Sequence, residues 1–180
     1  KYWSDLVKQL RPYEPGEQPC MDGVLKLNTN ENPFGPSPKV LSAIKAQLGN
    51  QLRLYPPPNA DLLKQAIADY YGLKDSQIFL GNGSDEILAH VFNGLLKKAL
   101  PLLFPDITYS FYPVFCQLYD IDFEEIPLRD DLSIDVTDYE VPNGGIIFPN
   151  PNAPTGRLLA IGEIEYLLKD DGVSLIHTIG

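Results

Sequence analysis

Hydrophobic residues recur along this chain at two spacings, which predict strands and helices in alternation. Short, unbroken apolar runs at Ile78–Leu80, Pro101–Phe104 and Ile146–Phe148 are typical of buried strands. Asp122–Pro127 is more polar and predicts an edge strand. Apolar residues three or four positions apart predict amphipathic helices, which lie at Tyr2–Leu10, after Ser37-Pro38, and at Ala60–Tyr71, Ile87–Leu96, Phe111–Tyr119 and Ile161–Leu168.

Strands separated by helices predict an α/β fold with a largely parallel sheet. In such a sheet, the loops that follow the carboxyl ends of the strands form the ligand-binding crevice. Three turn-rich loops occupy that position in the sequence: Gly81–Ser84, Pro105–Tyr109 and Pro149–Gly156. We therefore expect the functional residues to lie in these loops.

The ends of the helices are marked by serine and glycine. Ser37 is expected to cap the helix that follows it, and Gly72 is expected to end the next helix. Ser84 is expected to cap a third helix, whose first turn carries the favourably placed Asp85 and Glu86.

The glycine turn before this third helix is a candidate phosphate site. Gly81–Gly83 tolerates positive φ, and the unpaired N–H groups of the first helical turn can bind an anion. The carboxylates of Asp85 and Glu86 would repel a phosphate unless they point elsewhere. An ordinary capped turn explains the same residues, so this motif alone does not decide the function.

Composition and charge narrow the function classes. The 180 residues are 44% hydrophobic, which indicates a globular chain, and the net charge of −10 argues against a nucleic-acid or anionic-membrane surface. No apolar run approaches the ~20 residues that span a bilayer. Cys20 and Cys116 favour a reduced, cytoplasmic setting, and His90 and His177 lack partners at ligand spacing, so no metal is expected.

Five motifs together indicate a family. They are Leu27–Pro36, Leu54–Pro56, Gly81–Glu86, Asp106–Tyr112 and Asn150–Gly156. In this order and spacing they resemble the pyridoxal 5'-phosphate (PLP) aminotransferases of fold type I, and most closely the histidinol-phosphate branch. The resemblance implies a three-layer α/β/α large domain of the aspartate-aminotransferase type, incomplete here and with an N-terminal arm. It implies an arm and small-domain segment at residues 1–53 and a partial PLP-binding large domain at residues 54–180.

The resemblance also implies roles for particular residues in binding PLP. The backbone N–H groups of Gly83, Ser84 and Asp85 would hold the cofactor phosphate, so that the nearby carboxylates need not oppose it. Tyr109 would stack on the pyridine ring and hold its plane. Tyr55 would reach the phosphate of a neighbouring subunit, which implies a homodimer in the full-length enzyme.

The implied substrates are small amino acids and keto acids, with Asn32 and Gly35 on the substrate side. The implied reaction is transamination between histidinol phosphate or imidazole acetol phosphate and 2-oxoglutarate or glutamate, in histidine biosynthesis. An aromatic or broad-specificity aminotransferase is the alternative within the same class.

Two departures from the family pattern qualify this interpretation. Ala153 stands where many relatives have an asparagine that bonds the cofactor's phenolic oxygen, and the adjacent Asn152 is the candidate replacement. After Asp170 we find no counterpart of the family's Asp-Glu-Ala-Tyr strand, its cofactor-binding lysine or its arginines, so no catalytic residue is assigned. Val173–Ile176 resembles a helix that follows the missing strand, and truncation and internal deletion both stay open.

Readings from other classes also stay open. The chain alone is expected to be catalytically inactive, which makes an inactive fragment the main alternative. A dinucleotide-binding domain is disfavoured because Gly81–Gly83 lacks the third glycine of that fingerprint. A serine hydrolase is disfavoured because Asn82 and Glu86, rather than glycines, flank Ser84 two positions away.

Overall fold

The structure, a computed structural model, describes residues 2–10, 23, 25–27, 31–169 and 175–178. The chain divides into two compact units: a first unit of Lys1–Pro15 with Asn82–Gly180, and a second unit of Gly16–Gly81. The boundary predicted after residue 53 falls inside the second unit. The assignment of residues 1–53 and 54–180 to the family's two domains stays a prediction.

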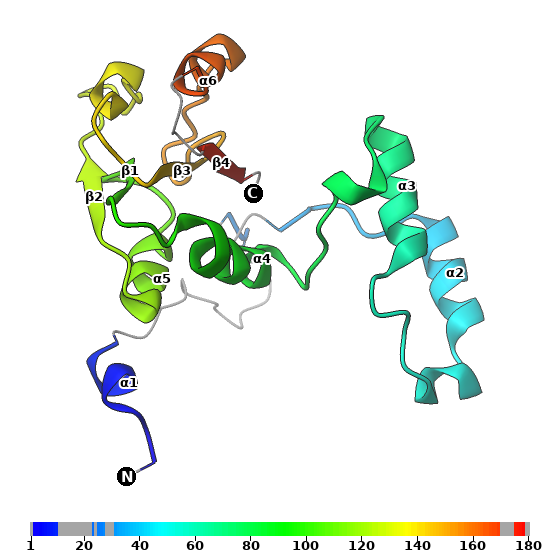
Figure 1. The fold of residues 1–180 in the computed structure, drawn as a ribbon. Coiled ribbons are helices and arrows are strands. Elements are labelled where there is room, and N and C mark those ends of the chain that lie inside the picture. The colour runs from blue at the N-terminus through cyan, green and yellow to red at the C-terminus, as the bar shows by residue number, and fades with distance from the viewer. Residues whose placement is uncertain (1, 11–22, 24, 28–30, 170–174, 179–180) are drawn as a thin grey trace. The chain divides into compact units, whose positions relative to one another are not determined.

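The first unit contains a four-stranded parallel sheet (Figure 1). The strands lie in the order β2-β1-β3-β4, with bounds β1 (Leu102–Pro105), β2 (Phe123–Ile126), β3 (Gly145–Pro149) and β4 (Leu175–Thr178). The inner strands β1 and β3 are buried throughout, whereas Glu124 and Glu125 of β2 are exposed. The predictions of two buried strands and a polar edge strand are therefore confirmed.

Two predictions of secondary structure are wrong. Ile78–Leu80 forms no strand, and Phe79 is 67% exposed. A strand forms only by pairing with a neighbour, and the sheet of the described residues consists of β1 to β4 alone. Conversely, Leu175–Thr178 falls partly in the segment read as a later helix, yet it pairs in parallel with β3. This pairing satisfies backbone groups of β3 that a bare edge would leave exposed.

Helices cover both faces of this sheet, as Figure 1 shows for α4 and α5 on one side and α6 on the other. The helical segments of the first unit are α1 (Asp5–Gln9), α4 (Ser84–Val91), the π-helix η3 (Phe92–Leu96), α5 (Tyr112–Tyr119), the 3-10 helix η4 (Val136–Tyr139) and α6 (Ile161–Leu167). The helices predicted from periodicity are confirmed, except that the helix predicted at Ile87–Leu96 changes to a π-helix after Val91. No described helix has the length and apolar character required to cross a membrane.

The core consists of two clusters that alternate along the strands. Leu102 and Phe104 of β1 pack in a cluster with α4, η3 and α5, whereas Leu103 packs in a second cluster with η4 and α6. Ile146 and Ile147 of β3 divide between the clusters in the same way. Successive side chains of a strand point to opposite faces, so both faces of the sheet are apolar and both are covered. This is the expected three-layer α/β/α arrangement.

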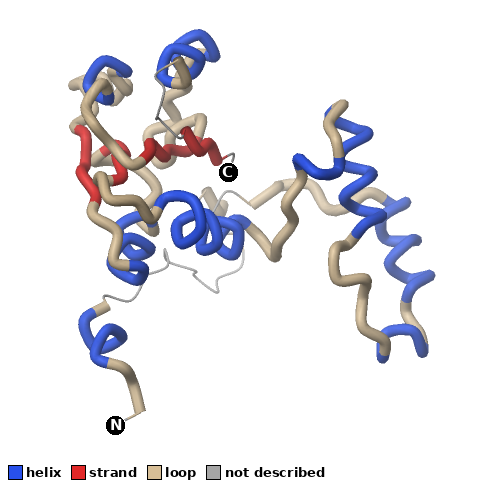
Figure 2. Tube along the Cα trace, viewed as in Figure 1, coloured by secondary structure: helices blue, strands red, loops and turns tan. Residues whose placement is uncertain are grey.

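The described part of the second unit contains helices and loops without strands (Figure 2). The helices are α2 (Pro38–Gln47), α3 (Asp61–Tyr71) and the 3-10 helices η1 (Asn50–Arg53) and η2 (Asp75–Gln77). The Ser37 hydroxyl accepts a hydrogen bond from the Val40 N–H at 3.4 Å, and Gly72 ends α3 with φ 67°, so both predicted caps are confirmed. Ala68 is the one buried residue among those described in this unit.

Cys116 of α5 provides a test of the core. Burial raises the pKa of its thiol from 9.0 to about 12, so the reactive thiolate is scarce in the folded protein at pH 8.5. We expect iodoacetamide to label Cys116 slowly in the native protein and rapidly in urea. Because an unfolded thiol ionises first, the stabilisation from this site should fall as pH rises from 9 to 12.

A Cys20→Ser variant leaves Cys116 as the single thiol of the 180 residues, so the labelling is unambiguous. Equal labelling rates in buffer and in urea would contradict the packing of α5 against the sheet.

Candidate functional site

Helix α4 begins directly after a glycine with a positive φ. Gly83 has φ 83°, which glycine adopts readily, and it occupies the N-cap position. Ser84 is therefore the first helical residue, and its prediction as the N-cap is wrong. No side chain makes a capping hydrogen bond at this N-cap. The N–H groups of the first turn are consequently left for an anion or for solvent.

The two acidic side chains of this first turn have partners within the protein. The Glu86 carboxylate accepts a hydrogen bond from the Asn82 N–H, just before the helix. The Tyr109 hydroxyl donates to Asp85 Oδ1 at 2.8 Å. Each of the two carboxylates is therefore held by a hydrogen bond from another group of the protein. The binding of a phosphate by the N–H groups of Gly83, Ser84 and Asp85 stays a prediction.

The loops after β1 and β3 are joined through a buried asparagine. Asn152 is completely buried, and its Oδ1 accepts a hydrogen bond from the Thr108 hydroxyl at 2.7 Å. Its Nδ2 donates to the Ile107 carbonyl at 2.9 Å. Because β1 and β3 are parallel neighbours, their carboxyl ends lie at one edge of the sheet. Two of the three predicted loops therefore meet there.

Asn152 also organises its own loop. Its Nδ2 donates to the Thr155 hydroxyl at 3.3 Å, its N–H donates to the Arg157 carbonyl at 2.7 Å, and its carbonyl accepts from the Gly156 N–H at 2.7 Å. Both hydrogens of the side-chain amide are thus directed at protein oxygens. Sequence reasoning missed this joining role and proposed only a cofactor contact for Asn152, which stays a prediction.

Tyr109 connects this pair of loops with α4. Its ring packs against the cluster under α4 and α5 and makes an edge contact with Tyr112, with 5.6 Å between ring centroids. Its hydroxyl reaches Asp85. The structure therefore brings together Asp85 from the first turn of α4, Thr108 and Tyr109 from the loop after β1, and Asn152 from the loop after β3.

Three further predicted site residues lie in the second unit. Tyr55 is fully exposed, and Asn32 and Gly35 are exposed as well. The Asn32 Oδ1 accepts a hydrogen bond from the Phe34 N–H at 2.9 Å, a local turn that shapes the Asn-Pro-Phe-Gly segment. The roles predicted for these residues stay predictions.

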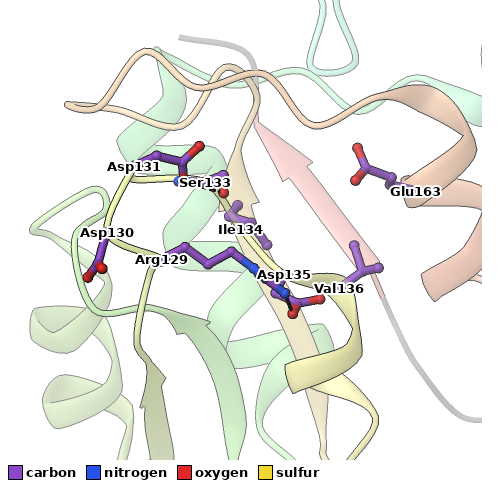
Figure 3. Close-up of a pocket in the computed structure, with 8 residues that line it drawn as sticks. All are labelled: Arg129, Asp130, Asp131, Ser133, Ile134, Asp135, Val136 and Glu163. Carbon is purple, nitrogen blue, oxygen red and sulfur yellow. Dashed lines mark hydrogen bonds and ion pairs between the residues drawn. The ribbon is translucent and has the colours of Figure 1, made fainter.

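A surface hollow of about 840 Å³ lies elsewhere in the first unit (Figure 3). It is lined by Arg129, Asp130, Asp131, Ser133, Ile134, Asp135, Val136 and Glu163. Most of its charged groups form contacts with residues close to them in the sequence. Arg129 pairs with Asp135, and Glu163 accepts from the N–H of Ala160 at 2.9 Å. Hydrogen bonds from Ser133 lower the pKa of Asp131.

Within the described part of the chain, no group of three or more His, Cys, Asp or Glu side chains is arranged to hold a metal ion.

The fold is that of proteins of the aminotransferase class. The structure of histidinol-phosphate aminotransferase from Clostridium acetobutylicum matches with a TM-score of 0.72 at 27% identity, over 83% of this chain and 45% of that chain. The enzyme from Sinorhizobium meliloti, in complex with pyridoxal-5'-phosphate, matches with a TM-score of 0.73 at 22% identity, over 83% and 42%. Both are aminotransferases of the same α/β fold.

Sequence similarity then gives the family. Residues 22–177 match the family described as aminotransferase class I and II, and the chain belongs to this family. It is 62% identical over 175 residues to histidinol-phosphate aminotransferase 1 of Methylococcus capsulatus, covering 97% of this chain and 49% of that protein. The corresponding protein of Pseudomonas fluorescens is 61% identical over 176 residues, covering 98% and 50%. The chain spans about half the length of these curated relatives.

The buried asparagine gives a testable prediction. An Asn152→Ala substitution removes the part-buried hydrogen bonds to Thr108 and Ile107. Each such bond contributes about 0.5–1.5 kcal/mol to stability. We expect faster amide hydrogen exchange in both loops, at residues 105–109 and 149–157. The measurement is hydrogen exchange with mass spectrometry on an enzyme of family length that carries this sequence as its amino-terminal half.

Thr108→Val and Thr108→Ser provide the matched pair for this experiment. The serine variant keeps the hydroxyl donor, so it should exchange like the unsubstituted protein. The valine variant loses the bond from Thr108 but keeps the bond from Asn152 to Ile107, so its exchange should be intermediate between that of the unsubstituted protein and that of Asn152→Ala. Unchanged exchange in Asn152→Ala would mean that the two loops are held by other contacts.

Proposed function

We propose that this chain forms the amino-terminal half of a PLP-dependent aminotransferase of histidine biosynthesis. The reaction exchanges an amino group between histidinol phosphate or imidazole acetol phosphate and 2-oxoglutarate or glutamate. One observation carries the proposal. The amino terminus of α4, which has no side-chain cap, is hydrogen-bonded through Asp85 to Tyr109, and the loop of Tyr109 is hydrogen-bonded to Asn152. The names of relatives about 60% identical support the substrate assignment.

The residues of the first unit fit the phosphate of PLP. Gly83 lies at the open end of α4, and a Cβ added there would meet no atom within 4 Å. Unobstructed backbone N–H groups at the positive end of a helix dipole are well suited to a phosphate group. The donors proposed are those of Gly83, Ser84 and Asp85. With PLP bound, the site has a carbonyl group for the substrate amine and an electron-withdrawing ring.

Tyr109 and Asn152 supply the remaining contacts proposed for this half of the site. The Tyr109 ring offers a flat surface for the cofactor ring, and the ring packs against the core. Asn152 holds the loop that bears Ala153, the position where many relatives have a cofactor-binding asparagine. The family's covalent lysine and its partner for the pyridine nitrogen have no counterpart in residues 1–180. We therefore propose the activity for a chain of family length.

A homodimer and a cytoplasmic location complete the proposal. The fully exposed ring of Tyr55 is available to a second subunit, where it would contact the partner's cofactor phosphate. Asn32 and Gly35 would border the substrate. Residues 1–53 would form the arm and small-domain segment, and residues 54–180 would form part of the large domain.

The experiment compares two proteins. One is an enzyme of family length with this sequence as its amino-terminal half, and the other is residues 1–180 alone. We expect the first to convert histidinol phosphate with 2-oxoglutarate in the presence of PLP. Its kcat/KM for histidinol phosphate should be higher than its kcat/KM for tyrosine or phenylalanine. We expect no turnover from the second, because it lacks the covalent anchor.

Three results would contradict these expectations. No PLP-dependent turnover in the longer protein would overturn the aminotransferase proposal, and a preference for aromatic amino acids would support the alternative specificity. A soluble, cooperatively folded fragment with transaminase activity would show that a lysine within residues 1–180 takes part in the chemistry.

Replacing the proposed stacking residue gives a second test. Tyr109→Ala should weaken PLP binding by about 0.5–1.5 kcal/mol beyond the loss of buried area, the usual contribution of aromatic stacking. Equilibrium dialysis of the family-length enzyme measures the change. Tyr70→Ala is the control, because Tyr70 is an exposed tyrosine of α3. If the two variants bind PLP equally well, Tyr109 does not stack on the cofactor.

A further inference from the structure

We infer that the side chain of Asp85 is a positioning group that orients Tyr109 for the cofactor ring, an inference that rests on the proposed function. The Tyr109 hydroxyl donates to Asp85 Oδ1 at 2.8 Å. Asp85 is the second residue of α4, and Tyr109 lies in the loop after β1. This single contact joins the helix terminus proposed for the phosphate to the side chain proposed for the ring.

The capping of α4 does not account for the Asp85 carboxylate. Gly83 occupies the N-cap position, and Glu86 accepts the hydrogen bond from the Asn82 N–H before the helix. An acidic residue in a first turn is favoured by the helix dipole. At this particular turn, however, a carboxylate would also repel the proposed phosphate. The Asp85 carboxylate accepts a hydrogen bond from the Tyr109 hydroxyl, which a neutral, nonpolar side chain could not do.

Several contacts restrain Tyr109. Its backbone follows Thr108, which is bonded to the buried Asn152. The side of its ring contacts Tyr112, and its far end contacts Asp85. Without the last contact, the ring loses the hydrogen bond that its hydroxyl makes to Asp85. A restrained ring loses less conformational entropy when a ligand stacks on it, so the contact favours binding by preorganisation.

The experiment separates the hydrogen bond from the charge. Asp85→Ala and Asp85→Asn both remove the negative charge, but only asparagine keeps an oxygen that accepts from Tyr109. In the family-length enzyme, we expect Asp85→Asn to bind PLP roughly 2- to 10-fold more tightly than Asp85→Ala, the range given by one net hydrogen bond. The visible circular dichroism of bound PLP should be retained in Asp85→Asn and reduced in Asp85→Ala, because it reports the orientation of the ring.

The same comparison in a Tyr109→Phe background isolates the pair. This background keeps the ring but removes the hydroxyl, so Asp85→Ala and Asp85→Asn should now bind PLP equally. Asp61→Ala and Asp61→Asn serve as controls, because Asp61 is an acidic residue in the first turn of α3, in the second unit. The inference is overturned if the alanine and asparagine variants agree with Tyr109 present, or differ equally with Tyr109→Phe.

A measurement without cofactor distinguishes this inference from the proposed function. Hydrogen exchange at residues 84–87 and 107–110 should be faster in Asp85→Ala than in Asp85→Asn, and only when Tyr109 is present. If the unsubstituted enzyme binds no PLP, the proposed function is overturned. Unequal exchange would then still support the coupling of Asp85 to Tyr109, and equal exchange would overturn it.

Discussion

The parallel pairing of β1 with β3 is the constraint on which the site depends. Parallel neighbours bring the loops after their carboxyl ends to the same edge of the sheet. The buried Asn152 then converts this proximity into direct bonds with Thr108 and Ile107. Because the Asn152 side chain is buried, its amide would be left without a partner in a water-poor environment if these bonds were lost. The position of Tyr109 therefore follows from the topology of the sheet and from one amide side chain.

Much of the fold could be predicted because its signals are local. Unbroken apolar runs identified β1 and β3, and Ser37 and Gly72 marked helix ends through their own backbone and side-chain chemistry. The errors arose where the outcome depends on a distant partner. Ile78–Leu80 has the composition of a strand but joins no ladder in the described residues. Leu175–Thr178 becomes a strand because β3 is beside it.

The site shows the same division between local and distant information. The glycine turn and the position of Tyr109 are visible as motifs, although Gly83 rather than Ser84 proved to be the N-cap. The bonds that assemble the site join residues 24 and 44 positions apart. A single sequence contains no direct record of such pairs, and many hydroxyl and amide groups would serve equally well. The packing of the sheet decides which of them meet.

The polar edge strand has a consequence for association between molecules. β2 borders the described sheet, and its exposed Glu124 and Glu125 are successive residues, so one carboxylate points to each side of the strand. A second copy that extended the sheet at this edge would bring its own pair of carboxylates close to these. The carboxylates of the two copies would repel each other on both faces of the extended sheet. This repulsion would oppose pairing between the backbone groups of the two edge strands. The two glutamates thereby disfavour aggregation through edge-to-edge strand pairing at β2.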